Sequence, residues 1–113
     1  MKPQVLSNLS YGIYAIGTKD AKRPNACIVN TVMQISKATP SDAPLVALSM
    51  NRENYSCECI EKSGVFSISV LSEATPATVI GALGLVSGRK TDKLENVRHK
   101  VLLEGVPVIK ENT

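Results

Sequence analysis

Short apolar segments rich in valine, isoleucine and threonine recur along the chain, and polar turns separate them. Residues of these types favour extended backbone, so each segment predicts a β-strand. The segment at 45–50 is almost entirely apolar and is expected to be a buried strand. Strands that are apolar on both faces are typical of a barrel whose outside is covered. We therefore expect a small, mainly β barrel built from residues 11–18, 25–36, 45–50 and 65–71, with shorter apolar pieces at 101–103 and 106–109.

Two short helices are expected between these strands. Asn51 or Asn54 can cap a helix that ends before Gly64, because an asparagine side chain accepts hydrogen bonds from the first free amides of a helix. Thr75 stands before a proline, as an N-cap stands before the first helical position, which predicts a second helix to about Leu83.

Length and composition limit the class of protein. The chain has 113 residues and a mass of 12.1 kDa, so we expect residues 1–113 to form a single domain. No apolar run is long enough to span a membrane and no signal-peptide pattern is present, so the expected location is cytoplasmic, without a membrane partner. A net charge of +3, with one Phe, three Tyr and no Trp, gives no stacking platform for a nucleic-acid partner.

Conventional catalytic groups are scarce in the sequence. His99 is the only histidine, no Gly-x-Ser-x-Gly elbow is present, and the carboxylates do not form an obvious acid–base pair. The three cysteines, Cys27, Cys57 and Cys59, are one thiol short of a closed four-cysteine metal site, and core packing is the commoner role of cysteine. We therefore predict no catalytic side chain and no metal, although a redox role for Cys27 stays open. If the protein is an enzyme, a cofactor must carry the chemistry.

Two polar stretches are candidate ligand sites. Between the expected strand at 45–50 and the helix that follows, Arg52 and Ser56 stand beside helix amides that favour a phosphate. An ordinary capped helix with a solvated arginine explains the same residues. Polar residues also interrupt the segment at 25–36, where they either line a ligand groove or form the solvated face of an edge strand: Asn30, Thr31 and Gln34.

A basic cluster lies near the C-terminal end of the sequence. It is interrupted by two acidic residues, which is typical of a solvated loop face. Alternatively, Arg89 and Lys90 fold over an anionic ligand that is held at the first site. The cluster consists of Arg89, Lys90, Lys93, Arg98 and Lys100.

The order and spacing of four motifs resemble the flavin reductase-like proteins, whose fold is an FMN-binding split β-barrel. The motifs are NACIVNTVMQIS at 25–36, PLVALSMNRENYS at 44–56, SGVFSISVL at 63–71 and SGRKTDK at 87–93. The last motif is most similar to the flavoredoxin branch, which includes the flavin domains of high-molecular-weight rubredoxins. Family members continue for several strands beyond the position of Gly105, so the resemblance implies either that residues 1–113 are a fragment of a longer protein or that the barrel is shortened at its C-terminus.

The resemblance implies FMN as the cofactor and assigns residues to it. The isoalloxazine ring and ribityl chain would contact Asn25, Cys27, Asn30, Thr31 and Gln34. Arg52 and Ser56 would hold the phosphate with Asn51 and Tyr55 beside them, while Arg89 and Lys90 would close over the flavin.

The resemblance also implies a homodimer with FMN at its interface and no dedicated acid or base. The expected function is an FMN-dependent oxidoreductase that passes electrons from NAD(P)H or a redox protein to a small acceptor or an electron-transfer protein. The alternative is a non-catalytic split-barrel module that binds a flavin or a partner protein.

Overall fold

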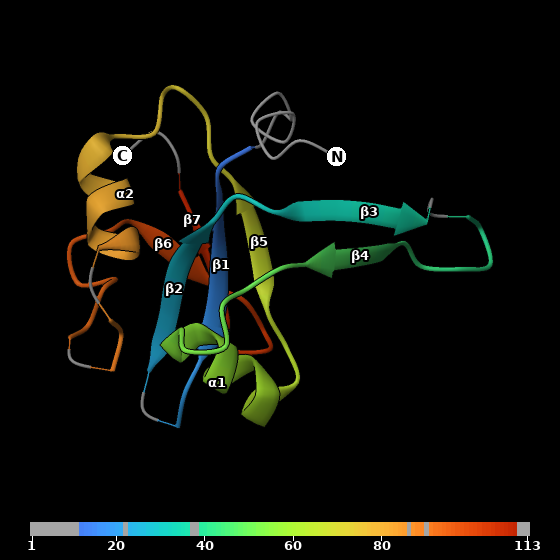
Figure 1. Ribbon diagram of the computed structural model, residues 1–113, viewed down its shortest axis with the longest axis horizontal. Helices are drawn as coiled ribbons and strands as arrows, with labels where there is room; N and C mark the ends of the chain where they lie inside the picture. Colours follow the sequence, from blue (N-terminus) through green and yellow to red (C-terminus); the bar gives the residue numbers. More distant parts are fainter. Residues whose placement is uncertain (1–11, 22, 37–38, 86, 90, 111–113) are drawn as a thin grey trace, which may run out of the picture.

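The computed structural model describes residues 12–21, 23–36, 39–85, 87–89 and 91–110, which form strands and two short helices (Figure 1). No helix within these residues is long and apolar enough to cross a membrane. The elements in chain order are β1 (Tyr14–Lys19), β2 (Pro24–Val29), β3 (Val32–Ser36), β4 (Leu45–Leu48), α1 (Tyr55–Ser63), β5 (Ser67–Val70), α2 (Ala77–Gly84), β6 (His99–Val101) and β7 (Pro107–Ile109).

The central sheet has the strand order β2-β1-β5, and both pairings are antiparallel. Its middle strand, β1, is buried along most of its length. The β6–β7 hairpin packs against this sheet, where Ser67 donates to the carbonyl of Pro107. A Cβ atom on Gly17 would collide with that same carbonyl, so the close approach of β7 requires glycine in β1.

The hydrophobic core lies between the sheet and α2. Leu83 of α2 is fully buried against Ala26 of β2 and Ala15 of β1. Leu94 and Val97, which follow the SGRKTDK motif at 87–93, belong to the same cluster. Burial of these side chains supplies the main driving force that holds the segment after α2 on the body of the protein.

The two helices have the local signals that the sequence indicated. Asn54 caps α1 by accepting a hydrogen bond from the Ser56 amide at 2.9 Å. Gly64 ends α1 in the left-handed conformation, with a φ of 75°. The N-cap expected at Thr75 is wrong by one residue: α2 is capped at Pro76, and the Thr75 hydroxyl instead accepts from the Ser72 amide in the preceding turn.

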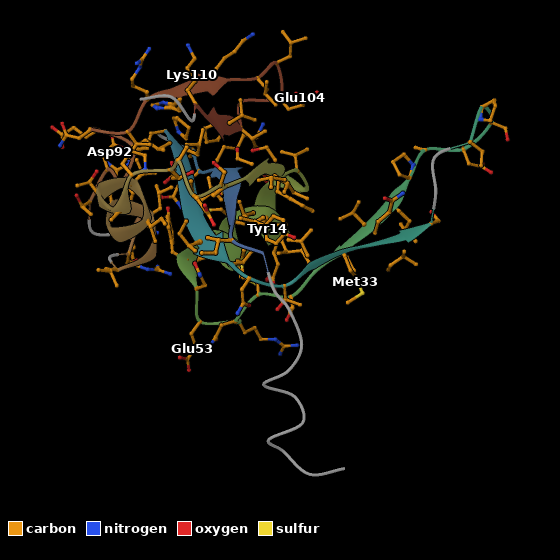
Figure 2. The ribbon with its side chains drawn as sticks, turned by 90° about the horizontal axis from the view of Figure 1, so that it is seen from above. Tyr14, Met33, Glu53, Asp92, Glu104 and Lys110 are labelled. Carbon is orange, nitrogen blue, oxygen red and sulfur yellow. The ribbon has the colours of Figure 1, made fainter. Side chains whose placement is uncertain are left out.

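The strand expected at 25–36 is two strands, which corrects the sequence prediction. The chain bends at Asn30, and β3 then leaves the central sheet to pair with β4 in a hairpin that extends away from the body (Figures 1 and 2). We call this hairpin the arm. The prediction of a buried strand at 45–50 is also wrong in this chain, because Leu45 is 57% exposed. Apolar residues alone indicated burial, but within the described residues β3 and β4 pack mainly against each other.

Candidate functional site

The N-terminus of α1 forms one wall of the candidate site. Helix amides at this end give it a partial positive charge, which favours anions. Cys27 of β2 lies beside it, near the side chains of Ser56 and Asn54. Burial raises the pKa of the Cys27 thiol, so this group is a neutral, protonated thiol at neutral pH and not an activated thiolate.

Asn25 ties three segments of the site together. Its buried side chain donates to the Ser56 hydroxyl at 3.1 Å and to the Thr18 hydroxyl at 3.4 Å. A Cβ atom on Gly88 would collide with the Asn25 amide, so this contact requires a glycine in the loop. The guanidinium of Arg23 donates to the Gly88 carbonyl at 3.1 Å. Through these contacts β2, α1 and residues 87–89 hold one another in place.

Lys93 is a buried cation beside the same helix end. Only 7% of the residue is exposed, and within the described residues it forms no salt bridge. Desolvation lowers the pKa of its ammonium group, because burial penalises the charged form.

We call the space that Lys93 faces the Lys93 cavity. Its volume is about 260 Å³, and the start of α1, the C-terminal end of α2 and the strand β2 enclose it. The lining residues are Cys27, Ile28, Glu53, Asn54, Tyr55, Leu83, Gly84, Leu85, Ser87 and Lys93.

A second, larger space lies on the other side of Tyr55. We call it the Tyr55–Arg89 cavity; its volume is about 660 Å³. It lies among the β1–β2 turn, the side of α1 and the loop at 88–89. Its lining residues are Lys19, Asp20, Ala21, Arg23, Tyr55, Glu58, Cys59, Lys62, Ser63, Gly88 and Arg89.

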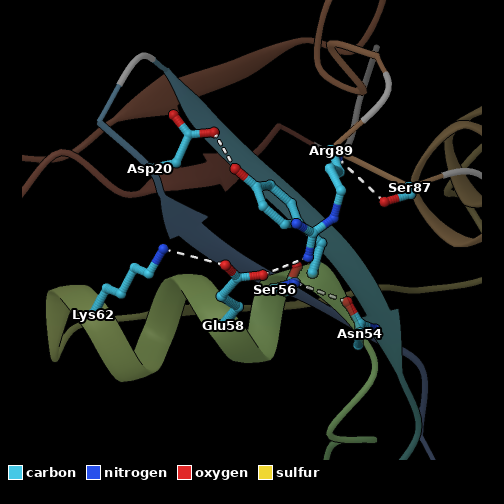
Figure 3. A network of polar contacts seen from close by, with 8 residues as sticks. Asp20, Asn54, Ser56, Glu58, Lys62, Ser87 and Arg89 are labelled. Carbon is cyan, nitrogen blue, oxygen red and sulfur yellow. Dashed lines mark hydrogen bonds and ion pairs between the residues drawn. The ribbon is translucent and has the colours of Figure 1, made fainter.

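A chain of polar contacts orders the wall of the Tyr55–Arg89 cavity (Figure 3). The Tyr55 hydroxyl donates to Asp20 at 2.6 Å, and this bond raises the pKa of Tyr55 above its usual value. The guanidinium of Arg89 lies over the Tyr55 ring, 4.8 Å from its centroid. Glu58 accepts from both Arg89 and Lys62, which lowers the pKa of its carboxyl group.

The structure brings several of the sequence-predicted residues together around α1. Tyr55 forms the wall that the two cavities share, while Cys27 and Arg89 each line one cavity. Ser56 is fully buried, so its hydroxyl faces the interior and accepts from Asn25.

The remaining predicted residues lie farther out. Asn51 and Arg52 are exposed on the loop before α1, where Asn51 accepts from the Glu53 amide at 2.9 Å. At the base of the arm, Thr31 donates to the Asn30 side chain at 2.9 Å. Exposed Gln34 donates to the Ser36 carbonyl at 2.8 Å. Lys90 lies outside the described residues.

Sequence reasoning missed Lys93 by grouping it with a solvated basic face. The grouping is wrong for this residue, because the turn that carries Lys93 is anchored in the core by Leu94 and Val97. The signal was present in the spacing: two apolar residues three apart follow the lysine directly.

Solved structures with this arrangement of strands and helices are split-barrel proteins. Flavoredoxin from Methanosarcina acetivorans aligns with a TM-score of 0.76 at 23% identity, over 98% of this chain and 59% of that one. The FMN-binding protein from Thermus thermophilus with bound p-hydroxybenzaldehyde aligns with a TM-score of 0.74 at 25% identity, over 91% and 56%. The expected fold class, a mainly β split barrel with two short helices that is shorter than its relatives, is confirmed.

The chain belongs to the flavin reductase like domain family, whose model matches residues 6–113. It is 37% identical to the high molecular weight rubredoxin of Moorella thermoacetica, over all of this chain and 48% of the relative. It is 30% identical to the ferric-chelate reductase (NAD(P)H) of Archaeoglobus fulgidus, over 99% of this chain and 64% of the relative. The chain thus spans about half to two-thirds of the length of these relatives.

Proposed function

We propose that this chain binds FMN and that the Lys93 cavity holds the phosphate end of the cofactor. The observation that carries the proposal is a buried ammonium group without a salt bridge in the described residues, placed at the N-terminus of α1. A buried charge without a counter-ion is costly, and a phosphate removes that cost. The helix end favours the same anion. Lys93 and the helix end therefore fit a phosphate group, whereas the acidic lining residue Glu53 is exposed to solvent.

The neighbouring residues would position this cation and the helix end. Asn25 and Ser56 act as positioning residues, since their polar groups bond to each other and hold β2 against α1. Arg52 and Asn51, exposed on the loop next to the cavity, would reach the phosphate from outside. Tyr55 would separate the phosphate from the larger cavity.

We propose that the flavin ring lies beyond Cys27, toward the base of the arm. The Lys93 cavity, at about 260 Å³, is at the small end of ligand pockets and suits the phosphate and ribityl end. Asn30 and Thr31 follow β2 two and three residues after Ile28, which lines that cavity. Their side chains and Gln34 are polar and at least partly exposed, so they can hydrogen-bond the edge of the ring.

A homodimer with FMN at its interface would explain the exposed arm. Met33, Ile35 and Leu45 of the arm are 56%, 60% and 57% exposed. Apolar residues that gather on one exposed element mark interaction sites. A second copy on this surface would bury the arm and cover the flavin ring that lies at its base.

The proposed activity is electron transfer from NAD(P)H or a redox protein to a small acceptor or an electron-transfer protein. The flavin, when bound, supplies the chemistry of accepting and passing on electrons. The chain's residues bind and orient it, and the neutral Cys27 thiol adds no negative charge beside the phosphate. The relatives named as a ferric-chelate reductase and a rubredoxin support this class of activity. We further propose that residues 1–113 act as one flavin-binding unit.

An absorbance spectrum of the purified protein, with mass spectrometry of what heat releases, tests the cofactor. We expect a flavin spectrum, the mass of FMN, and bleaching when NADH, NADPH or a reduced redox protein is added without oxygen. A colourless protein that takes up no added FMN would contradict the proposal. Bound flavin that no donor reduces would favour the non-catalytic module.

A further inference from the structure

Lys93 is a nucleophile as well as a cation. Only 7% of the residue is exposed, and it lines the Lys93 cavity. Within the part of the chain that the structure describes, no residue forms an ion pair or a hydrogen bond with its amine. Burial lowers the pKa of this group from the ordinary 10.5, so more of it is the unprotonated amine than in a solvated lysine. The unprotonated amine is the form that attacks a carbonyl carbon.

The other titratable groups of the cavity do not compete with this amine. Cys27 is also a nucleophile, but burial raises the pKa of its thiol, which stays protonated at neutral pH. The Tyr55 hydroxyl donates to Asp20, which lines the Tyr55–Arg89 cavity. Glu53 is exposed to solvent. The amine of Lys93 is therefore the group of this cavity that meets a carbonyl compound in a reactive form.

The helix end decides which carbonyl compounds are held beside this amine. Asn54 and Tyr55, at the start of α1, line the same cavity as Lys93. The amides of a helix N-terminus favour a phosphate. In an acyl phosphate a single oxygen atom joins the acyl carbon to phosphorus, so a phosphate held at the helix end places that carbon next to the amine. The volume of about 260 Å³ has room for a small acyl group besides the phosphate.

We propose that Lys93 is a site of acylation by small acyl phosphates, and that this modification switches off phosphate binding in the Lys93 cavity. The Lys93 nitrogen attacks the acyl carbon and forms an amide bond. The bond from that carbon to the bridging oxygen breaks, and inorganic phosphate leaves with the electron pair and takes up the amine proton. No oxidant, reductant or further reagent is consumed.

The product no longer suits an anion. An amide carries no charge, and the acyl group occupies space that the phosphate would fill. The modified chain would therefore lose its affinity for a phosphorylated cofactor. The acylation rests only on the anion site at Lys93, whereas its effect on flavin binding rests on the proposed function.

Incubation of the full chain with acetyl phosphate, followed by mass spectrometry of its peptides, tests the site. Lys100 and Lys110 are internal controls, because both are exposed and neither lines the cavity. We expect Lys93 to be acetylated about fivefold faster or more than either control. Inorganic phosphate, which competes for the helix end, should slow the reaction at Lys93 alone. Acetic anhydride, which carries no phosphate, should modify the two exposed lysines first.

The effect on the cofactor is measured with the acetylated chain after the reagent is removed. It should bind FMN about tenfold or more weakly than the untreated chain. Chain treated in the presence of inorganic phosphate is the matched control, because it carries the same acetyl groups on its exposed lysines but few on Lys93. Equal FMN affinity of the two treated samples would overturn the proposed switch.

Two results would overturn the acylation site itself: acetyl phosphate modifies Lys93 no faster than the controls, or inorganic phosphate gives no protection. The outcome is separate from that of the proposed function. If the untreated chain binds no FMN while Lys93 is acetylated selectively and phosphate protects it, the proposed function fails and the acylation site stands. If FMN binds and Lys93 reacts no faster than the controls, the acylation site fails and the proposed function stands.

Discussion

The two cavities on either side of Tyr55 use positive charge in different ways. In the Lys93 cavity a single ammonium group is buried, and no described carboxylate forms a salt bridge with it. In the Tyr55–Arg89 cavity the cations are more exposed, and two of them share Glu58. Water and salt screen exposed ion pairs, whereas a buried charge is screened much less and is costly unless an opposite charge pairs with it. The first cavity is therefore suited to hold one anion tightly, and the second to recognise a larger ligand weakly.

The largest expected effect comes from removing the buried cation. Lys93→Met keeps the apolar stem and deletes the charge, so the Kd of FMN should rise about tenfold to a hundredfold. Flavin fluorescence titration measures it, with Lys100→Met as the control because Lys100 is exposed on β6. Without FMN the variant should be no less stable than the wild type, because the buried charge and its desolvation cost are gone. An unchanged Kd would mean that Lys93 does not hold the phosphate, and that the two cavities do not differ in the way they bind anions.

The next largest effect is expected in the loop at 87–89, which borders both cavities. Gly88→Ala places a methyl group against Asn25, so we expect a loss of about 1–3 kcal/mol in the free energy of unfolding. Gly81→Ala is the matched control in α2, where the nearest atom would lie 3.8 Å away. That change should be neutral or stabilising by up to about 1 kcal/mol. Urea denaturation of both variants measures the difference, and equal values would show that Asn25 does not hold the loop.

A smaller effect is expected at the helix cap that faces the Lys93 cavity. Asn54→Ala removes the side chain that accepts from the Ser56 amide, which should lower the free energy of unfolding by about 1 kcal/mol. Exposed Asn96 offers the control, and Asn96→Ala should leave the urea midpoint unchanged. If the two variants unfold at the same urea concentration, Asn54 contributes nothing as a cap.

The smallest effect on stability is expected at the two exposed ion pairs that Glu58 forms in the Tyr55–Arg89 cavity. Glu58→Gln removes the carboxylate that Arg89 and Lys62 share, yet the urea midpoint should stay the same, because exposed ion pairs contribute little to stability. FMN affinity should also be unchanged. A clear loss of stability in low salt would mean that this network is structural.

Local signals predicted much of the fold. Asn54 accepts from the Ser56 amide through its side chain, and the Gly64 amide donates to the Ile60 carbonyl. Both caps of α1 depend on residues within a few positions, so they can be recognised in the sequence. The bend at Asn30 could not be recognised in the sequence, because valine and isoleucine favour a strand on both sides of it. The bend follows from the pairing of β3 with β4, which takes β3 out of the central sheet. The burial of Lys93 was missed for a related reason: it depends on Leu94 and Val97 packing under α2, a contact between distant segments.

The central claim is that Lys93 meets the phosphate of FMN, and riboflavin, which lacks that phosphate, provides the comparison. The affinities of both ligands should be measured from neutral pH up to 10.5, the ordinary pKa of lysine. Burial lowers the pKa of Lys93, so the ammonium group loses its proton below that value as the pH rises. FMN should bind more tightly than riboflavin at neutral pH, and the ratio should fall as the pH rises; in Lys93→Met the ratio should be small and constant. A ratio that is the same in wild type and variant at every pH would contradict the claim.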